Sequence, residues 1–214
     1  WGAHDDIVFK RFLNDHSTVN QPFFSTILTL SSHEPFEIPT ENTFEGDDER
    51  SKFMNAMHYA DQSLGDFIDS AKKQSWWPNT LVVIIADHGH RIPETGKKAD
   101  DFKIPMLWLG GALAKQGLEM PKIASQIDIS STLLNQVGLN AYAYNWSKNI
   151  FDLKTKPWAF FSFNNGFGFI QPKQELVFDN VGKKMIQLNG SLNTRDIDKG
   201  KALMQRMFQD YLDK

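Results

Sequence analysis

The chain has 214 residues, 41% of them hydrophobic, and its 26 acidic and 23 basic residues give a formal net charge of −3. This composition is ordinary for a globular protein of one or two domains, and it excludes a wholly disordered chain or a broadly basic nucleic-acid coat. No apolar run is long enough to span a membrane. The chain contains no cysteine, so disulfides, thiolate metal ligands and cysteine nucleophiles are excluded within it.

Helical and strand-like patterns alternate through the first two thirds of the chain. Apolar spacing predicts one helix from Asp5 to His16, a second along the stripe from Phe53 to Ala71, and a third that begins at Asp128. Continuous apolar runs predict buried strands over Phe23–Leu30, Thr80–Ala86 and Ile104–Leu109. We therefore expect an α/β fold with part of a doubly wound, mainly parallel sheet.

The pattern changes beyond residue 150. Short apolar runs joined by Asn and Gly turns between Trp158 and Leu188 predict an antiparallel meander. A final amphipathic helix carries Ile197, Met204 and Phe208 on one side. The predicted domains are thus residues 1–151, an α/β domain, and residues 152–214, a small antiparallel β subdomain with a C-terminal helix.

Two candidate metal ligands stand directly after a predicted strand. Ligands of open α/β sheets bind at the carboxyl ends of the strands, and Asp87 and His88 occupy that position with Gly89 behind them. A carboxylate and an imidazole side by side can both bind a divalent cation, which would polarise a phosphoryl or sulfuryl oxygen. The alternative is a turn aspartate beside a histidine that only makes a hydrogen bond.

Other polar residues follow the predicted strand ends. His33 ends the run from Phe23 and could contact an anionic substrate or act as a general acid, or simply bond to the backbone. His90 and Arg91 are candidates for contacting a metal ligand or the substrate. Asp128 precedes a helical pattern, and we expect it to be the N-cap of that helix in preference to a metal ligand.

Several segments together resemble a known family. In order and spacing they are similar to the C-terminal half of a sulfatase-type domain of the alkaline phosphatase superfamily, closest to the lipoteichoic acid synthase and phosphoglycerol transferase branch. The resemblance covers residues 1–140, and residues beyond them are similar to the small C-terminal subdomain of that branch. The segments that carry it are Phe23–Phe36 with Ser-Ser-His33-Glu-Pro, Tyr59–Ile68, Asn79–Gly89 with Ala-Asp87-His88-Gly, Ile104–Gly111 and Gln126–Leu134.

The resemblance implies roles for individual residues. Asp87 and His88 match the adjacent metal ligands of the family, and His33 matches the histidine that contacts the substrate phosphate. The nucleophile is a threonine in the synthase branch and a formylglycine in true sulfatases, and it lies upstream of the matched segments, so we expect these residues alone to be inactive. Manganese is the expected metal, with zinc, calcium or magnesium as alternatives, and two ligands would hold it only weakly.

We therefore expect the C-terminal portion of a metal-dependent enzyme that acts on anionic phosphate esters of envelope lipids or glycans. A true sulfatase is the alternative reaction, and a non-catalytic domain that senses or binds envelope lipids is the alternative class. Expected partners are the anionic ester and the N-terminal half of the same protein, with an exposed sheet edge that could join two copies and no nucleic acid. The family resemblance places the domain outside the cytoplasm, anchored by N-terminal membrane helices that residues 1–214 lack.

Overall fold

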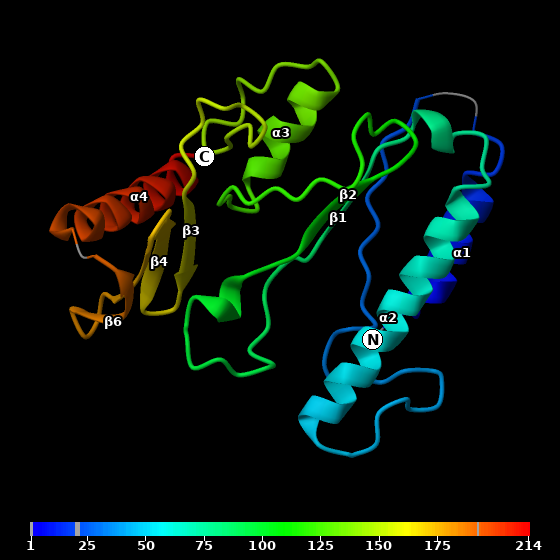
Figure 1. Ribbon diagram of the computed structural model, residues 1–214, viewed down its shortest axis with the longest axis horizontal. Coiled ribbons are helices and arrows are strands. Elements are labelled where there is room, and N and C mark those ends of the chain that lie inside the picture. Colours follow the sequence, from blue (N-terminus) through cyan, green and yellow to red (C-terminus); the bar gives the residue numbers. More distant parts are fainter. Residues whose placement is uncertain (1, 20–21, 192) are drawn as a thin grey trace. The chain divides into compact units, whose positions relative to one another are not determined.

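The computed structural model describes residues 2–19, 22–191 and 193–214 (Figure 1). The chain divides into two compact units. Unit 1 comprises Trp1–Asp87 and Ile104–Leu118, and unit 2 comprises His88–Lys103 and Glu119–Lys214. The predicted domain division between residues 151 and 152 stays a prediction.

Two helices form the core of unit 1, and both were predicted. Helix α1 (Asp5–Asp15) packs on α2 (Glu49–Ala71), and the rings of Phe9 and Phe67 stack with centroids 4.6 Å apart. Trp76 closes the same cluster just before the 3₁₀ helix η1 (Trp77–Asn79). The apolar stripe of α2 therefore faces α1, because aromatic side chains of both helices stack in this buried cluster.

The remaining regular structure of unit 1 is a two-stranded ribbon. Strand β1 (Val82–Ile85) pairs with β2 (Met106–Leu109) in antiparallel register. Both strands were predicted, but the expected mainly parallel sheet is wrong for the described residues, where every strand pair is antiparallel. A parallel pair needs a crossover, usually through a helix, and between β1 and β2 the chain forms only the 3₁₀ helix η2 (Asp100–Phe102).

The predicted buried strand over Phe23–Leu30 is also wrong. The segment is irregular, and no described strand pairs with it. Phe24 is 83% exposed and Leu28 70% exposed, whereas Phe23 and Ile27 pack on the α1–α2 cluster. The apolar run therefore has the composition of a strand without a neighbouring strand, and composition alone does not supply the backbone partners that a sheet requires.

Unit 2 contains the meander that the sequence predicts. Four antiparallel strands follow one another in spatial order β3-β4-β5-β6, and α4 packs against β4. The elements are α3 (Asp128–Gln136), β3 (Ala159–Phe163), β4 (Gly166–Gln171), β5 (Gln174–Asp179), β6 (Lys184–Gly190) and α4 (Thr194–Leu212).

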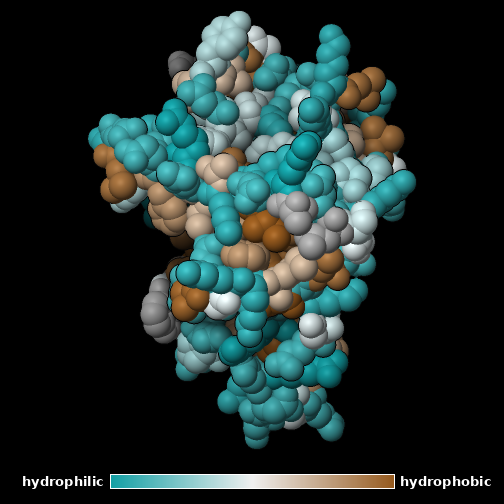
Figure 2. All heavy atoms as spheres, turned by 90° about the vertical axis from the view of Figure 1, so that its left-hand side faces the viewer, coloured by the Kyte–Doolittle hydropathy of each residue, from teal (hydrophilic) through white to brown (hydrophobic). Residues whose placement is uncertain are grey.

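The core of unit 2 lies between the sheet and α4. Phe167 and Leu176 are fully buried there, and Ile197 and Met204 of the helix pack against the same cluster. Figure 2 looks onto the side of the molecule that bears α4 and β6, where hydrophilic residues cover most of the surface and hydrophobic ones form smaller patches. Among the described residues, none of the helices combines the length and apolar character that a bilayer-spanning segment requires.

Candidate functional site

Asp87 and His88 lie immediately beyond the end of β1, and both residues are exposed. The ring of His88 is oriented by its own turn, because Nδ1 lies 2.8 Å from the backbone carbonyl oxygen of Gly89. A carbonyl oxygen can only accept a hydrogen bond, so Nδ1 carries the proton and Nε2 is the unprotonated nitrogen of the neutral ring. Nε2 is therefore the atom through which His88 would bind a metal ion.

The chemistry of this pair fits a divalent cation. A carboxylate and a neutral imidazole nitrogen are ligands that Mn²⁺ and Zn²⁺ both accept. Over residues 2–19, 22–191 and 193–214, no three His, Asp or Glu side chains come together as a metal site. Asp87 and His88 thus fit such an ion as two of its ligands and not as a complete ligand set.

His33 stands on a tight turn of unit 1 that α1 holds in place. The carboxylate of Asp5, only 2% exposed, accepts the backbone N–H groups of Leu30 and Ser31 at 3.0 Å each. The hydroxyl of Ser31 in turn accepts the N–H of Asp5 at 3.0 Å. This reciprocal pairing at the first residue of α1 fixes the backbone two residues before His33, which explains how a segment without strand partners still presents His33 in a defined place.

The side chain of His33 lines an open groove of about 600 Å³ in unit 1. Its Nδ1 lies 2.7 Å from the carbonyl oxygen of Glu34, so Nδ1 carries the proton, as in His88. The first turn of α2 contributes Glu49 and Lys52 to the groove. Phe36, buried and in the left-handed region at φ 64°, packs edge-on against Phe53 of α2. The groove therefore presents an imidazole and an ammonium group beside the carboxylates of Glu34 and Glu49.

His90 has the opposite tautomer. Its Nδ1 accepts the backbone N–H of Ile92 at 3.1 Å, so the proton of the neutral ring is on Nε2. A protonated Nε2 donates a hydrogen bond and does not bind a metal, which suits a contact with an anionic oxygen. Arg91 beside it is exposed. The two histidines that flank Gly89 are thus set up for different tasks by their backbone partners.

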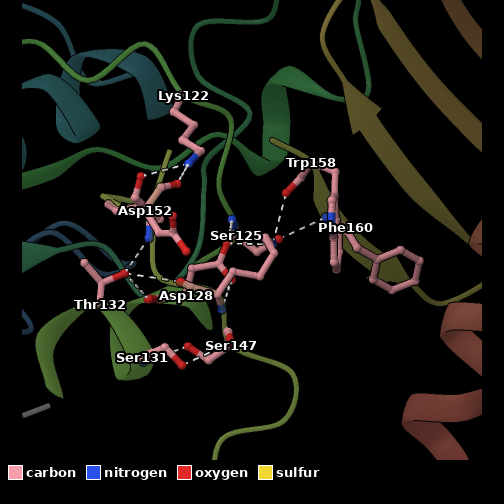
Figure 3. Close-up of polar contacts among 11 residues, drawn as sticks. Lys122, Ser125, Asp128, Ser131, Thr132, Ser147, Asp152, Trp158 and Phe160 are labelled. Carbon is pink, nitrogen blue, oxygen red and sulfur yellow. Dashed lines mark hydrogen bonds and ion pairs between the residues drawn. The ribbon is translucent and has the colours of Figure 1, made fainter. Parts of the chain in front are cut away.

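Asp128 is the centre of a buried polar network in unit 2 (Figure 3). Its carboxylate is 1% exposed, forms an ion pair with Lys148 at 2.8 Å, and accepts the backbone N–H groups of Ser125 and Lys148 at 2.8 and 2.9 Å. The N-cap prediction for Asp128 is wrong, because α3 begins at Asp128 itself and the carboxylate accepts from a residue that precedes the helix. It is a structural residue, satisfied by three donors.

The rest of the network joins α3 to the chain that leads into the sheet. Thr132 donates its hydroxyl to the backbone oxygen of Asp128 at 2.6 Å and accepts the N–H of Ile150 at 3.1 Å, and Lys122 donates to the backbone oxygen of Asp152 at 2.6 Å (Figure 3). The N–H of Phe160 in β3 donates to the hydroxyl of Ser125 at 3.1 Å. These bonds hold the irregular segment between α3 and β3. Lys148 was not predicted as part of this network, since a lone lysine in a loop is usually solvated.

Comparison with known proteins identifies the family. The family model for sulfatases matches residues 1–139, which include all five predicted site residues: His33, Asp87, His88, His90 and Arg91. The chain belongs to the sulfatase family. Its curated relatives include the lipoteichoic acid synthases of several Staphylococcus aureus strains, among them USA300 and COL, each 26% identical over 163 residues. The match covers 67% of this chain and 25% of the synthase, so the chain spans about a quarter of the length of these relatives.

Two solved structures share the fold. A protein of the alkaline phosphatase superfamily from Vibrio parahaemolyticus matches 99% of this chain and 56% of its own, with a TM-score of 0.78 and 26% identity. The lipoteichoic acid synthase of Listeria monocytogenes matches 100% of this chain and 60% of its own, with a TM-score of 0.74 and 20% identity. The family resemblance predicted from the sequence is confirmed, and the fold is that of alkaline phosphatase superfamily members.

Proposed function

We propose that this chain supplies part of the active site of a divalent-metal-dependent enzyme that transfers or hydrolyses phosphate esters, of the phosphoglycerol transferase type. The observation that carries the proposal is the position of Asp87 and His88 directly after β1, with the proton of His88 held on Nδ1 by the carbonyl oxygen of Gly89. Membership of the sulfatase family and similarity to lipoteichoic acid synthases support it.

Each residue has a task in this proposal. Asp87 and His88 Nε2 would hold the metal ion, which would supply Lewis-acid polarisation of a phosphoryl oxygen. His33, held by the turn that Asp5 anchors, contacts the ester in the groove and, when protonated, donates a proton toward the leaving oxygen. His90 donates from Nε2–H to an anionic oxygen, and Arg91 adds positive charge beside it.

The nucleophile and the further metal ligands belong, in this proposal, to polypeptide outside residues 1–214. The described residues offer only two ligands in one place, which is too few for a tight site. The same polypeptide would cover the apolar side chains that unit 1 exposes, such as Phe24, Leu28 and Leu107. Gel filtration tests this covering: a chain of 214 residues that elutes as a well-folded monomer without the upstream half would contradict it, and a homodimer would assign the surface to a second copy.

The substrate is an anionic phosphate ester of an envelope lipid or glycan, and the site of action is outside the cytoplasmic membrane. Within the groove, His33 and Lys52 are the groups that would contact an anionic head group, while the carboxylates of Glu34 and Glu49 would restrict where it can lie. The similarity to lipoteichoic acid synthases supports an envelope substrate. Nucleic acid is not the expected partner of a chain with a net charge of −3.

The test is hydrolysis of a chromogenic phosphodiester and a chromogenic sulfate ester by the full product of the gene, with Mn²⁺ and then Zn²⁺. We expect turnover of the phosphodiester, abolished by Asp87→Asn and retained in Glu94→Gln, which alters an exposed carboxylate of the same loop. Preference for the sulfate ester would identify a true sulfatase. Absence of both metal binding and turnover would leave a non-catalytic lipid-binding domain.

A further inference from the structure

The sheet of unit 2 is covered on both of its faces, each by a different part of the chain. Helix α4 covers the face that carries Phe167 and Leu176. The opposite face carries Phe161, Gly168 and Val177, and Val177 is fully buried although an antiparallel sheet commonly leaves its second face to solvent. The segment around η2, which follows the Asp87-His88 turn along the chain, covers this second face (Figure 1).

An aromatic contact attaches this segment to the sheet. The ring of Phe102 in η2 stacks on that of Phe161 in β3, with centroids 4.1 Å apart and planes 12° from parallel. The ring of Phe161 lies flat over its cross-strand neighbour Gly168, where a Cβ atom would come within 2.0 Å of it. Phe161 is therefore held between Gly168 and Phe102, and only a residue without a side chain at position 168 permits this.

Polar contacts attach the same segment at a second point. The backbone N–H of Ala99, which is 3% exposed, donates to the side-chain oxygen of Gln187 in β6 at 3.0 Å. Lys103 lies 3.8 Å from the carboxylate of Glu175 in β5 and is paired with Asp100 in η2. The segment is thus fixed to three of the four strands through β3, β5 and β6.

The anchored segment in turn supports the turn that carries His88. A Cβ atom at Gly89 would come within 2.3 Å of the backbone oxygen of Asp101, next to Phe102 in η2. The backbone of Gly89 therefore rests on η2, and its carbonyl oxygen is the acceptor for Nδ1 of His88. A continuous series of contacts runs from Gly168 through Phe161 and Phe102 to the imidazole of His88.

We propose that the antiparallel sheet is a platform that orients the imidazole of His88 toward the metal, with Phe161 and Gln187 as positioning residues. The inference rests on the proposed function, since it assigns a purpose to the sheet only if His88 is a ligand. Residues that orient a ligating histidine without touching the metal alter metal affinity when they are changed. The sheet would then contribute to the metal centre as well as to the stability of unit 2.

The test follows the ring resonances of His88 by NMR in the 214-residue chain during titration with Mn²⁺, which broadens signals of nuclei near the ion. The signal of His88 is assigned by its loss in His88→Gln. Phe161→Leu removes the flat ring and keeps an apolar side chain. Phe160→Leu is the matched control, because Phe160 is the neighbouring residue and packs on Phe167 at the other face of the sheet.

We expect Phe161→Leu to need about tenfold or more Mn²⁺ for the same broadening, whereas Phe160→Leu and Phe161→Tyr match the wild type. Tryptic cleavage after Arg91 and Lys97, both exposed, should accelerate only in Phe161→Leu. If that variant does not fold, Gln187→Leu, which removes the acceptor for Ala99, is expected to shift the titration in the same direction.

Two results would contradict the role of the sheet, and one of them would also contradict the proposed metal binding by His88. The sheet does not orient His88 if the folded variant, Phe161→Leu or Gln187→Leu, needs the same Mn²⁺ concentration for broadening as the wild type. The same conclusion follows if the control variant Phe160→Leu shifts that concentration as much as Phe161→Leu or Gln187→Leu does. The proposed function would survive that result. Absence of any broadening of His88 in the wild type would refute the assignment of His88 as a ligand and the platform with it.

Discussion

The β-structures of the two units differ in how completely their own chain covers them. The four-stranded sheet of unit 2 has α4 on one face and the η2 segment on the other, and Val177 is fully buried between them. The two-stranded ribbon of unit 1 leaves Leu107 55% exposed, and the segment before His33 leaves Leu28 70% exposed. Unit 2 therefore has a sheet that its own chain covers on both faces, whereas unit 1 has an α1–α2 core beside apolar residues that no described residue covers.

Loss of Asp128 is expected to have the largest effect. Asp128→Ala removes a carboxylate that is 1% exposed and leaves the ammonium group of Lys148, 17% exposed, without its ion-pair partner. Breaking a buried ion pair on one side costs about 3–5 kcal/mol of unfolding free energy. Urea unfolding followed by circular dichroism checks this, and Asp152→Ala, whose bond to Lys122 uses the backbone oxygen, is the control expected to cost less. A cost below that of the control would contradict a structural role for Asp128.

Replacing a leucine by alanine is expected to have different costs in the two units. Leu176→Ala empties a fully buried position in unit 2 and should cost about 2–5 kcal/mol. Leu28→Ala, measured in the 214-residue chain without the upstream polypeptide proposed to cover it, changes a side chain that is 70% exposed in unit 1 and should stay within about 0.5 kcal/mol. Thermal unfolding of both variants gives the two values. A large cost for Leu28→Ala would show that this side chain is covered in solution, for example by a second copy of the chain.

The stability of unit 2 is expected to depend on pH in the acidic range because of a carboxylate at the start of α4. A hydrogen bond from Lys199, opposed in part by burial, lowers the pKa of Asp196 below its usual 3.8, and Gln171 and Gln174 also lower it. Because the folded-state pKa lies below the unfolded one, the stabilisation is complete above 3.8 and is lost as pH falls through the folded-state pKa. Asp196→Asn should therefore cost about 1 kcal/mol at pH 7 and progressively less at more acidic pH.

Melting temperatures of the wild type and Asp196→Asn between pH 7 and pH 2 test this dependence. Asp198→Asn changes an exposed carboxylate of the same helix and serves as the control. The difference between the wild type and Asp196→Asn should narrow as the solution becomes more acidic. A difference that stays constant over this range would show that the charge of Asp196 contributes nothing to stability.

The sequence predicted the parts of the fold that depend on local patterns. The apolar stripe from Phe53 to Ala71 predicted α2, and the Asn and Gly turns after Trp158 predicted the meander. Both patterns mark faces that are buried by other parts of the same chain. The prediction of a strand over Phe23–Leu30 was wrong, and β1 pairs in antiparallel register where a parallel strand was predicted. Pairing depends on neighbours far along the chain, which composition does not reveal.

The sequence was enough to predict which residues form the candidate site, but not the hydrogen bonds that orient their side chains. The position after a strand identified Asp87 and His88, yet the tautomers of His88 and His90 follow from single backbone contacts that no spacing encodes. The anchor at Asp5 was not predictable either, since an aspartate at the start of a helix is usually read as part of its first turn. Their roles as metal ligand and substrate contact remain predictions.

Binding of a divalent metal ion by Asp87 and His88 is tested by the electron paramagnetic resonance signal of free Mn²⁺ titrated with the 214-residue chain. We expect the wild type to bind Mn²⁺ weakly, because it offers two protein ligands, and so to lower the signal of the free ion. Asp87→Asn and His88→Gln should not lower it, and Glu94→Gln should behave as the wild type. Equal binding by the wild type and Asp87→Asn, or no binding by either, would contradict metal binding by this pair.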